Sequence, residues 1–177
     1  GAKQRIGSAA AELVSDGEAI VLDASTTSWH VARALLSHRD VTVLTTGLYI
    51  AMELLRSPGI SVLIPGGRVW REAAAVVGEL NEEILKGGNL QRAFYGGRGI
   101  TLEEGLTDPN REEVAMKRDL LKQVNELNVI VDASKIGKVA FASCASLKDI
   151  DRVITEESAP EEFVKGLRER DVEVLLV

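Results

Sequence analysis

The chain has 177 residues, 45% of them apolar and only 4% aromatic, which suits a single domain with a core of Val, Leu, Ile and Ala. Its formal net charge of −6 argues against nucleic acid as a direct partner of this segment, although a few local cations can hold a small anion. One cysteine, Cys144, and two isolated histidines argue against a disulfide or a metal site, so we expect neither a metal nor a cofactor.

Helices and apolar strands alternate along the chain. The sequence predicts helices over 3–15, 25–36, 48–56, 79–86, 111–126 and 160–170. It predicts strands over 19–22, 41–45, 60–64, 92–95, 127–132, 151–155 and 172–177, and a strand or extended piece over 139–145. Continuous apolar strands separated by helices are typical of an α/β fold, in which a mostly parallel sheet is covered by helices on both faces.

In a parallel sheet of this kind, ligands bind at the carboxyl ends of the strands. Five loops of the chain follow predicted strands in this way, namely 23–27, 45–47, 65–71, 96–110 and 132–138. We therefore expect the binding residues to lie in these loops and at the helix starts beside them.

The loop after the first strand reads Asp23-Ala24-Ser25-Thr26-Thr27 and opens a helix. Small hydroxyl residues at a helix start leave backbone N–H groups free and add O–H donors, a combination that suits phosphate. The alternative is that Ser25 or Thr27 only caps the helix, and taken alone the loop favours capping. The two roles are compatible.

Two further loops carry a cation in a position that suits a ligand. Gly66 and Gly67 allow the backbone to turn sharply and approach a ligand, and Arg68 beside them suits a carboxylate or phosphate. Lys135, at the end of the segment 132–135, is placed to reach over a strand end toward a phosphate. The alternatives are a plain turn with a solvated arginine and an ordinary surface lysine.

The helix that starts at Asn110 carries Glu113 and Lys117 one turn apart. They form an i,i+4 pair, and acids suit the first turn of a helix, so a structural role is favoured when this helix is taken alone. In the functional alternative, Glu113 points into the cleft and accepts hydroxyl groups of a ligand. Four other large side chains are expected to pack rather than to stack on a ligand: Trp29, Trp70, Met52 and Met116.

The order of these motifs is more specific than any one of them. The chain resembles the sensor domain of DeoR-type transcription regulators through the succession DASTT, VTVLTTGLYIAMEL, IPGGRV, VVGEL, YGGRGITLEEGLTDPNREEVAMKRDLL and VIVDASKIGKVAFA. The specific part is the pair GLT-x-PN-x-EE…KR and DASK-x-G-x-VAFA. The resemblance runs from about Lys3 to Val177.

The resemblance implies the α/β fold shared with ribose-5-phosphate isomerase and glucosamine-phosphate deaminase, and a phosphorylated sugar or related metabolite as effector. It also implies a homo-oligomeric regulator, usually a repressor, that contacts DNA only through an N-terminal winged helix-turn-helix, which we do not find in this sequence. No apolar run is long enough to cross a bilayer and no signal peptide is visible, so we expect a cytoplasmic protein with no membrane contact.

The resemblance assigns the site as well. The hydroxyl-rich loop, the double glycine, the Glu and Lys of the long helix and the lysine after strand 127–132 each match a family motif. The full set of residues expected to bind the ligand, with no catalytic residue and no metal ligand, is Asp23, Ser25, Thr26, Thr27, Thr46, Gly66, Gly67, Arg68, Gly97, Arg98, Glu113, Lys117 and Lys135.

The chain departs from the family pattern in three places. The family often has Thr-Asn-Ser over 45–47, where this chain has Thr-Thr-Gly, so an amide contact is missing. Arg98 stands where the family often has an acid, which puts the usual contact to a sugar hydroxyl in doubt and could favour a more anionic effector. Ala24 replaces a common glycine and restricts the backbone of the first loop.

Two other functions compete with that of a sensor. A sugar-phosphate isomerase on the same fold would use Glu113 as its base, but the acids expected after strand 92–95 are replaced by the segment Tyr-Gly-Gly-Arg-Gly over 95–99. A pure oligomerisation module with a degenerate pocket is the second alternative, because a shared fold does not settle function.

Overall fold

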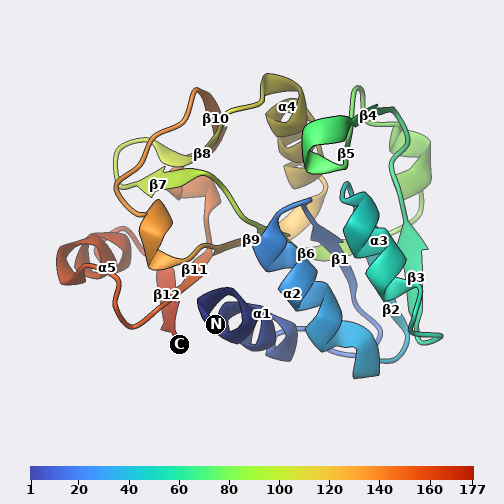
Figure 1. Cartoon of the computed structure of the whole chain (residues 1–177), viewed down its shortest axis with the longest axis horizontal. Helices are drawn as coiled ribbons and strands as arrows, with labels where there is room; N and C mark the ends of the chain where they lie inside the picture. Colours follow the sequence, from blue (N-terminus) through green and yellow to red (C-terminus); the bar gives the residue numbers. More distant parts are fainter.

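The computed structural model describes all of residues 1–177 and contains a seven-stranded sheet in the order β12-β11-β9-β6-β1-β2-β3 (Figure 1). Each pair of neighbouring strands is parallel. The strands are β1 (Ala19–Leu22), β2 (Val41–Thr45), β3 (Ile60–Leu63), β6 (Leu90–Tyr95), β9 (Val124–Ile130), β11 (Arg152–Thr155) and β12 (Glu173–Leu176). The expected parallel sheet is confirmed.

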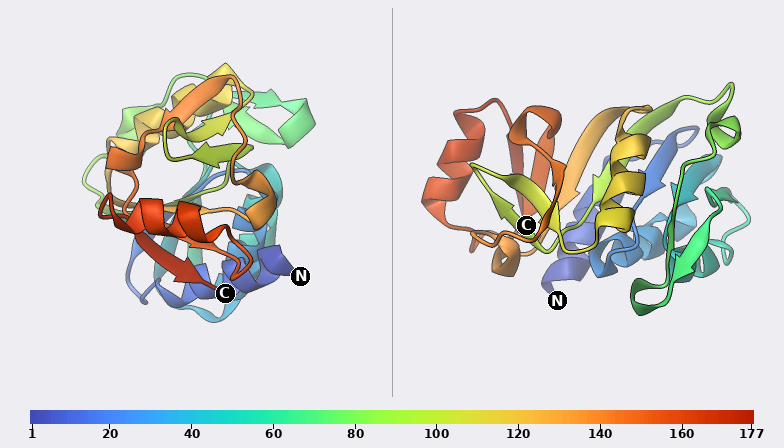
Figure 2. Two further views of the ribbon diagram at one scale, coloured as in Figure 1. Left: turned by 90° about the vertical axis from the view of Figure 1, so that its left-hand side faces the viewer. Right: turned by 90° about the horizontal axis from the view of Figure 1, so that it is seen from above.

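Helices cover both faces of this sheet, as the two views of Figure 2 show. The helices are α1 (Ala2–Glu12), α2 (Thr26–Ala34), α3 (Leu48–Leu54), α4 (Arg111–Leu121) and α5 (Glu161–Arg168). Along β1, Ile20 and Leu22 belong to the core under α1, α2 and α3, whereas Val21 belongs to the core under α4 and α5. Both faces of the central strand are therefore buried, which explains its continuous apolar sequence.

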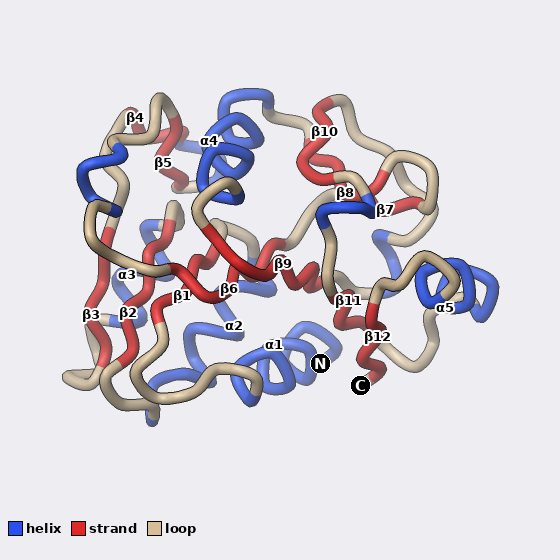
Figure 3. The backbone as a smooth tube through the Cα atoms, turned by 180° about the vertical axis from the view of Figure 1, so that it is seen from behind, coloured by secondary structure: helices blue, strands red, loops and turns tan.

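Two small antiparallel sheets lie outside the main sheet (Figure 3), and of their strands only the one within the segment 139–145 was expected from the sequence. The hairpin β4 (Arg68–Trp70) and β5 (Ala75–Val77) follows Gly67, whose φ of 128° few other residues adopt. The strands β7 (Gly99–Thr101), β8 (Gly105–Asp108) and β10 (Ala142–Ala145) form the other sheet. Strands this short, bounded by glycines, leave too little alternating pattern to be recognised in the sequence.

Two predicted helices were wrong in part. The helix expected over 79–86 is only a 3₁₀ turn, Glu82–Leu85, before two consecutive glycines. The helix expected over 111–126 ends at Leu121, and the chain has already entered β9 at Val124, which pairs with Leu90 of β6. Here strand pairing overrides the helix-forming tendency of the polar residues.

The core on the α4 face contains Met116, buried as expected, and Cys144, which is buried too. Burial raises the pKa of the Cys144 thiol to about 11, which keeps it protonated at neutral pH. None of the helices combines the length and the apolar character that crossing a membrane requires.

The order of the strands reverses at β1. The chain runs outward from β1 to β2 and β3, then returns to place β6 on the other side of β1 and continues outward through β9, β11 and β12. The carboxyl ends of β1 and β6 therefore lie side by side with their connections leading in opposite directions. Open α/β sheets bind ligands at such a switch point.

Candidate ligand-binding site

A cavity of about 860 Å³ opens at this edge of the sheet. Its wall is formed by the loops after β1, β2, β6 and β9, by the β4–β5 hairpin, and by the starts of α1 and α4. This volume lies within the range of small-molecule sites in proteins. Eight of the thirteen expected ligand residues line it: Asp23, Ser25, Thr26, Thr27, Gly97, Arg98, Glu113 and Lys135.

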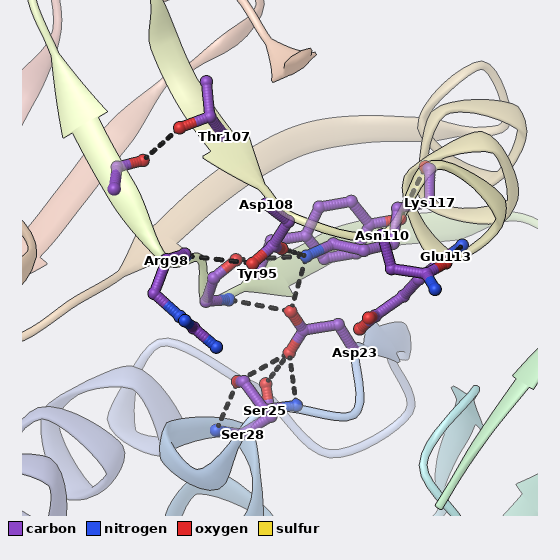
Figure 4. Close-up of polar contacts among 12 residues, drawn as sticks. Asp23, Ser25, Ser28, Tyr95, Arg98, Thr107, Asp108, Asn110, Glu113 and Lys117 are labelled. Atoms are coloured by element: carbon purple, nitrogen blue, oxygen red, sulfur yellow. Dashed lines mark hydrogen bonds and ion pairs between the residues drawn. The ribbon is translucent and has the colours of Figure 1, made fainter. Parts of the chain in front are cut away.

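Asp23, at the end of β1, organises the floor of the cavity (Figure 4). One of its carboxylate oxygens accepts hydrogen bonds from Ser25 Oγ at 2.7 Å and from Ser28 Oγ at 2.5 Å. The other accepts from the Gly96 N–H at 2.9 Å and from Lys117 Nζ at 2.8 Å. The carboxylate of Asp23 therefore joins the loops after β1 and β6 to α4, and it is only 1% exposed.

A glycine is needed at the end of β6 for this arrangement. A Cβ at Gly96 would lie 2.6 Å from Ser25 Oγ, closer than real Cβ contacts allow. The loops after β1 and β6 approach each other this closely only because position 96 has no side chain.

Lys117 is buried beneath the cavity rather than exposed in it. Besides Asp23, its ammonium donates to Asp108 Oδ2 at 3.1 Å and to the Gly96 carbonyl at 3.0 Å, and it lies 4.7 Å from the centre of the Tyr95 ring. An ammonium group has three donors, and all three are used here. The structure thus places Lys117 as a support for the site, outside the residues that line the cavity.

The charges of this cluster stabilise one another. Burial alone would raise the pKa of Asp23, but the charge of Lys117 and the hydrogen bonds from Lys117, Ser28 and Ser25 together lower it. Burial alone would lower the pKa of Lys117, but Asp23 and the nearby acids raise it well above its usual value. Both groups are therefore ionised at neutral pH.

Glu113 is the unusual acid of the site. Its backbone N–H is capped by Asn110 Oδ1 at 2.8 Å, while its carboxyl group makes no hydrogen bond or ion pair and lines the cavity. Burial raises its pKa to about 7, with Asp23 and Asp108 adding to the rise and Lys117 opposing it. Close to neutral pH this carboxyl group can therefore either donate or accept a hydrogen bond.

Positively charged side chains border the cavity where α2 and the 132–135 segment meet it. Arg98 and Lys135 line it there, and neither side chain forms an ion pair. In the first turn of α2, the Ser28 N–H is capped by Ser25 Oγ at 3.1 Å, whereas the N–H groups of Thr26 and Thr27 have no acceptor inside the helix. Thr26 and Lys135 thus share one cavity, as a common anion site requires.

Four other expected ligand residues lie outside the cavity. Arg68 forms an exposed ion pair with Glu112 at 2.6 Å. Gly66 and Gly67 shape the backbone before β4, with φ of 74° and 128°. Thr46 is buried, and its carbonyl accepts from the Val76 N–H at 2.8 Å, which ties the loop after β2 to the hairpin. The loop after β3 thus positions the hairpin, and its double glycine does not touch the cavity.

The cavity also has lining residues that the sequence analysis did not assign to it. Trp29, Trp70 and Met52, expected to pack rather than to stack on a ligand, all line the cavity. Asp108 occupies the position x of the motif GLT-x-PN, which the motif leaves unspecified. Lys3 is far from the motifs in the sequence, and nothing in the residues around it signals its place in the wall.

The chain is similar in sequence to known transcription regulators. Residues 1–157 match the family model described as the DeoR C terminal sensor domain. The HTH-type transcriptional regulator GolR of Listeria innocua is 35% identical over 97% of this chain and 68% of its own length. A putative aga operon transcriptional repressor of Escherichia coli O157:H7 is 31% identical over 99% of this chain and 65% of its own length. The chain thus spans about two thirds of these relatives.

Solved structures share the fold at low sequence identity. Ribose 5-phosphate isomerase from Plasmodium falciparum matches with a TM-score of 0.56 and 16% identity, over 76% of this chain and 52% of its own. eIF2B delta from Chaetomium thermophilum matches with a TM-score of 0.56 and 19% identity, over 86% of this chain and 54% of its own. An enzyme and a translation factor with the same fold show that the fold alone does not define the activity.

Proposed function

Because the chain belongs to the DeoR family of transcription regulators, as a C-terminal sensor domain, we propose that its cavity binds a phosphorylated sugar or related metabolite. Its relatives are regulators, so the chain is a regulatory domain and not an isomerase. In the intact, homo-oligomeric and cytoplasmic regulator, effector binding would shift the balance between two domain arrangements and release DNA held by an N-terminal helix-turn-helix. Relatives named as repressors support release of DNA, rather than its binding, as the response to the effector.

The observation that carries the proposal is the pairing of free cations with free backbone donors in one cavity. Arg98 and Lys135 line the cavity together with Thr26 and Thr27, whose N–H groups have no acceptor within α2. Two positive charges and a helix N-terminus are suited to a phosphate group. Glu113, without a partner of its own, is suited to the hydroxyl groups of the attached sugar.

In this proposal, Asp23 and Lys117 position the binding residues without touching the ligand. Each is already saturated with partners inside the protein, so neither has a donor or acceptor left for an effector. Their contribution is to hold the loops after β1 and β6 against each other.

A thermal-shift experiment tests the function with matched pairs of sugars and their phosphates. A ligand that binds only the folded chain raises the melting temperature, so we expect at least one sugar phosphate to do so while its parent sugar does not. If no phosphorylated compound raises the melting temperature, the chain is an oligomerisation module with a degenerate pocket and the proposal is wrong.

Lys135→Ala separates the phosphate contact from the sugar contacts. We expect the affinity for the phosphorylated sugar to fall by about tenfold or more, since a charge-assisted hydrogen bond is lost, measured by calorimetric titration. The matched control is Lys148→Ala, an exposed lysine outside the cavity, which should leave the affinity unchanged. Equal losses for the sugar and its phosphate would contradict the role of Lys135.

A further inference from the structure

The first turn of α1 contributes a cation to the cavity. Lys3 lines the cavity together with Asp132 and Lys135, is half-buried, and forms no ion pair. The charges of Lys135 and Lys3 both help to lower the pKa of the Asp132 carboxyl group, after the larger effects of burial and of the Ser134 hydrogen bonds. Lys3 therefore lies on the same side of the cavity as Lys135.

The helix that carries Lys3 is packed against one wall of the cavity. Ile6, Ala10 and Ala11 of α1 are buried in the same core as Val31 and Ala32 of α2. A Cβ at Gly7 would lie 2.7 Å from His30, so α1 and α2 touch backbone to backbone at this point. A shift of α2 as a rigid element would therefore displace α1 as well.

A second connection joins α1 to the segment 132–135. Arg5 lies 3.5 Å from one carboxylate oxygen of Glu156, whose other oxygen accepts the N–H of Ala133 at 3.0 Å. Ala133 precedes Lys135 by two residues in the segment that borders the cavity. The first two turns of α1 thus contact both segments that would surround a bound anion.

The first turn of α1 has no negative charge to complement the helix dipole. It contains Lys3 but no acidic residue. Its order depends on its packing, so a new charge contact at Lys3 can change its position or its mobility.

We propose that Lys3 is a third cationic contact to the anion in the cavity, and that α1 passes the occupancy of the cavity to the chain that precedes it. This inference rests on the proposed function, since it requires an anion beside Lys135 and Thr26. α1 is the element to which an N-terminal DNA-binding segment would connect. An effector that holds Lys3 thus acts on the junction between sensing and DNA binding.

The test uses inorganic phosphate as the probe and backbone amide NMR of this chain as the readout. We expect phosphate to shift the amide signals of Thr26, Thr27 and Lys135 and, in the same titration, those of residues 2–6 in α1. In Lys3→Gln the signals of residues 2–6 should no longer respond. The phosphate affinity should fall by at least about threefold, as for the loss of one partly exposed charge.

Two control variants separate a binding role from a structural one. Lys3→Arg keeps the charge and should keep both the affinity and the response of α1. Lys148→Gln, an exposed lysine outside the cavity, should behave as the unmodified chain. The melting temperature without phosphate should be the same for all of these variants.

The outcomes distinguish this inference from the proposed function. If phosphate shifts Thr26, Thr27 and Lys135 but Lys3→Gln changes neither the affinity nor the α1 signals, the anion site stands and the role of Lys3 is wrong. If phosphate shifts none of these amides, the anion site itself is absent and both proposals fail.

Discussion

Two groups of charged side chains lie at the same cavity. In one group the charges are paired within the protein, and in the other they are not. Asp23, Asp108 and Lys117 form a closed cluster, in which the ammonium lies 2.8 Å from one acid and 3.1 Å from the other. Arg98 and Lys135 form an open group without ion-pair partners, and Figure 4 draws no contact from the Arg98 guanidinium to the residues around it.

The comparison separates positioning from binding. A buried ion pair gains its energy from its own partners and holds the backbone around it, but it has nothing left to offer a ligand. A cation in a cavity without a partner is in the reverse state, because an incoming anion supplies the contact it lacks. The three predictions below test this division, from the largest expected effect to the smallest.

Lys117→Met should be the most damaging change. It leaves Asp23 and Asp108 close together without their cation, so we expect a loss of about 3–5 kcal/mol in the free energy of unfolding, measured by urea denaturation. Lys122→Met, at the C-cap of the same helix and with a side chain 73% exposed, is the matched control and should cost less than about 1 kcal/mol. Similar losses for both variants would show that the closed cluster is not what holds the site.

Glu113→Gln should change how stability depends on pH. The folded chain holds the Glu113 proton up to about pH 7, whereas the usual value of this carboxyl group is 4.5, so the folded state binds more protons between these values. Stability contributed by this group is complete below pH 4.5 and is lost as the pH rises through 7. Glu113→Gln should remove this loss, on the order of 2 kcal/mol, in urea denaturation at pH 5 and pH 8.

The neighbouring residue supplies the control for this experiment. Glu112 has a side chain 57% exposed and points away from the cavity toward Arg68, so Glu112→Gln should keep the pH dependence of the unmodified chain. A Glu113→Gln variant that also keeps that dependence would mean that the carboxyl group titrates at an ordinary pH. Glu113 would then be ionised at neutral pH like an ordinary surface acid.

Arg68→Gln should have the smallest effect. The ion pair between Arg68 and Glu112 joins two side chains that are 62% and 57% exposed, and such pairs contribute about 0–1 kcal/mol. The affinity for a sugar phosphate should not change, because Arg68 lies outside the cavity. A clear loss of affinity in calorimetric titration would instead show that Arg68 contacts the ligand.

The sequence was sufficient for the parts of the site that depend on local order. A strand followed by hydroxyl residues at a helix start predicts that Thr26 and Thr27 lie at the edge of the sheet where the strands end, and strand 127–132 followed by a lysine predicts the same for Lys135. All three line the cavity at that edge. Neither conclusion needs the rest of the fold.

What the sequence could not supply are contacts between distant segments. Asp23 and Lys117 are 94 positions apart, and only the adjacency of β1 and β6 brings α4 over the end of β1. Periodicity places Lys117 on a helix but cannot tell a buried ion from one facing a ligand. Lys3 is the stronger case, since it reaches the cavity only because α1 packs against α2.

The buried thiol of Cys144 can report on opening of the core. Cys144 is the single cysteine, is 4% exposed, and belongs to the core that also contains Met116 of α4. A thiol reagent in solution can modify it only when that core opens, so the rate of labelling measures how often this half of the molecule separates from the sheet. Saturating the cavity with a small anion should slow that rate if ligand binding tightens the domain as a whole.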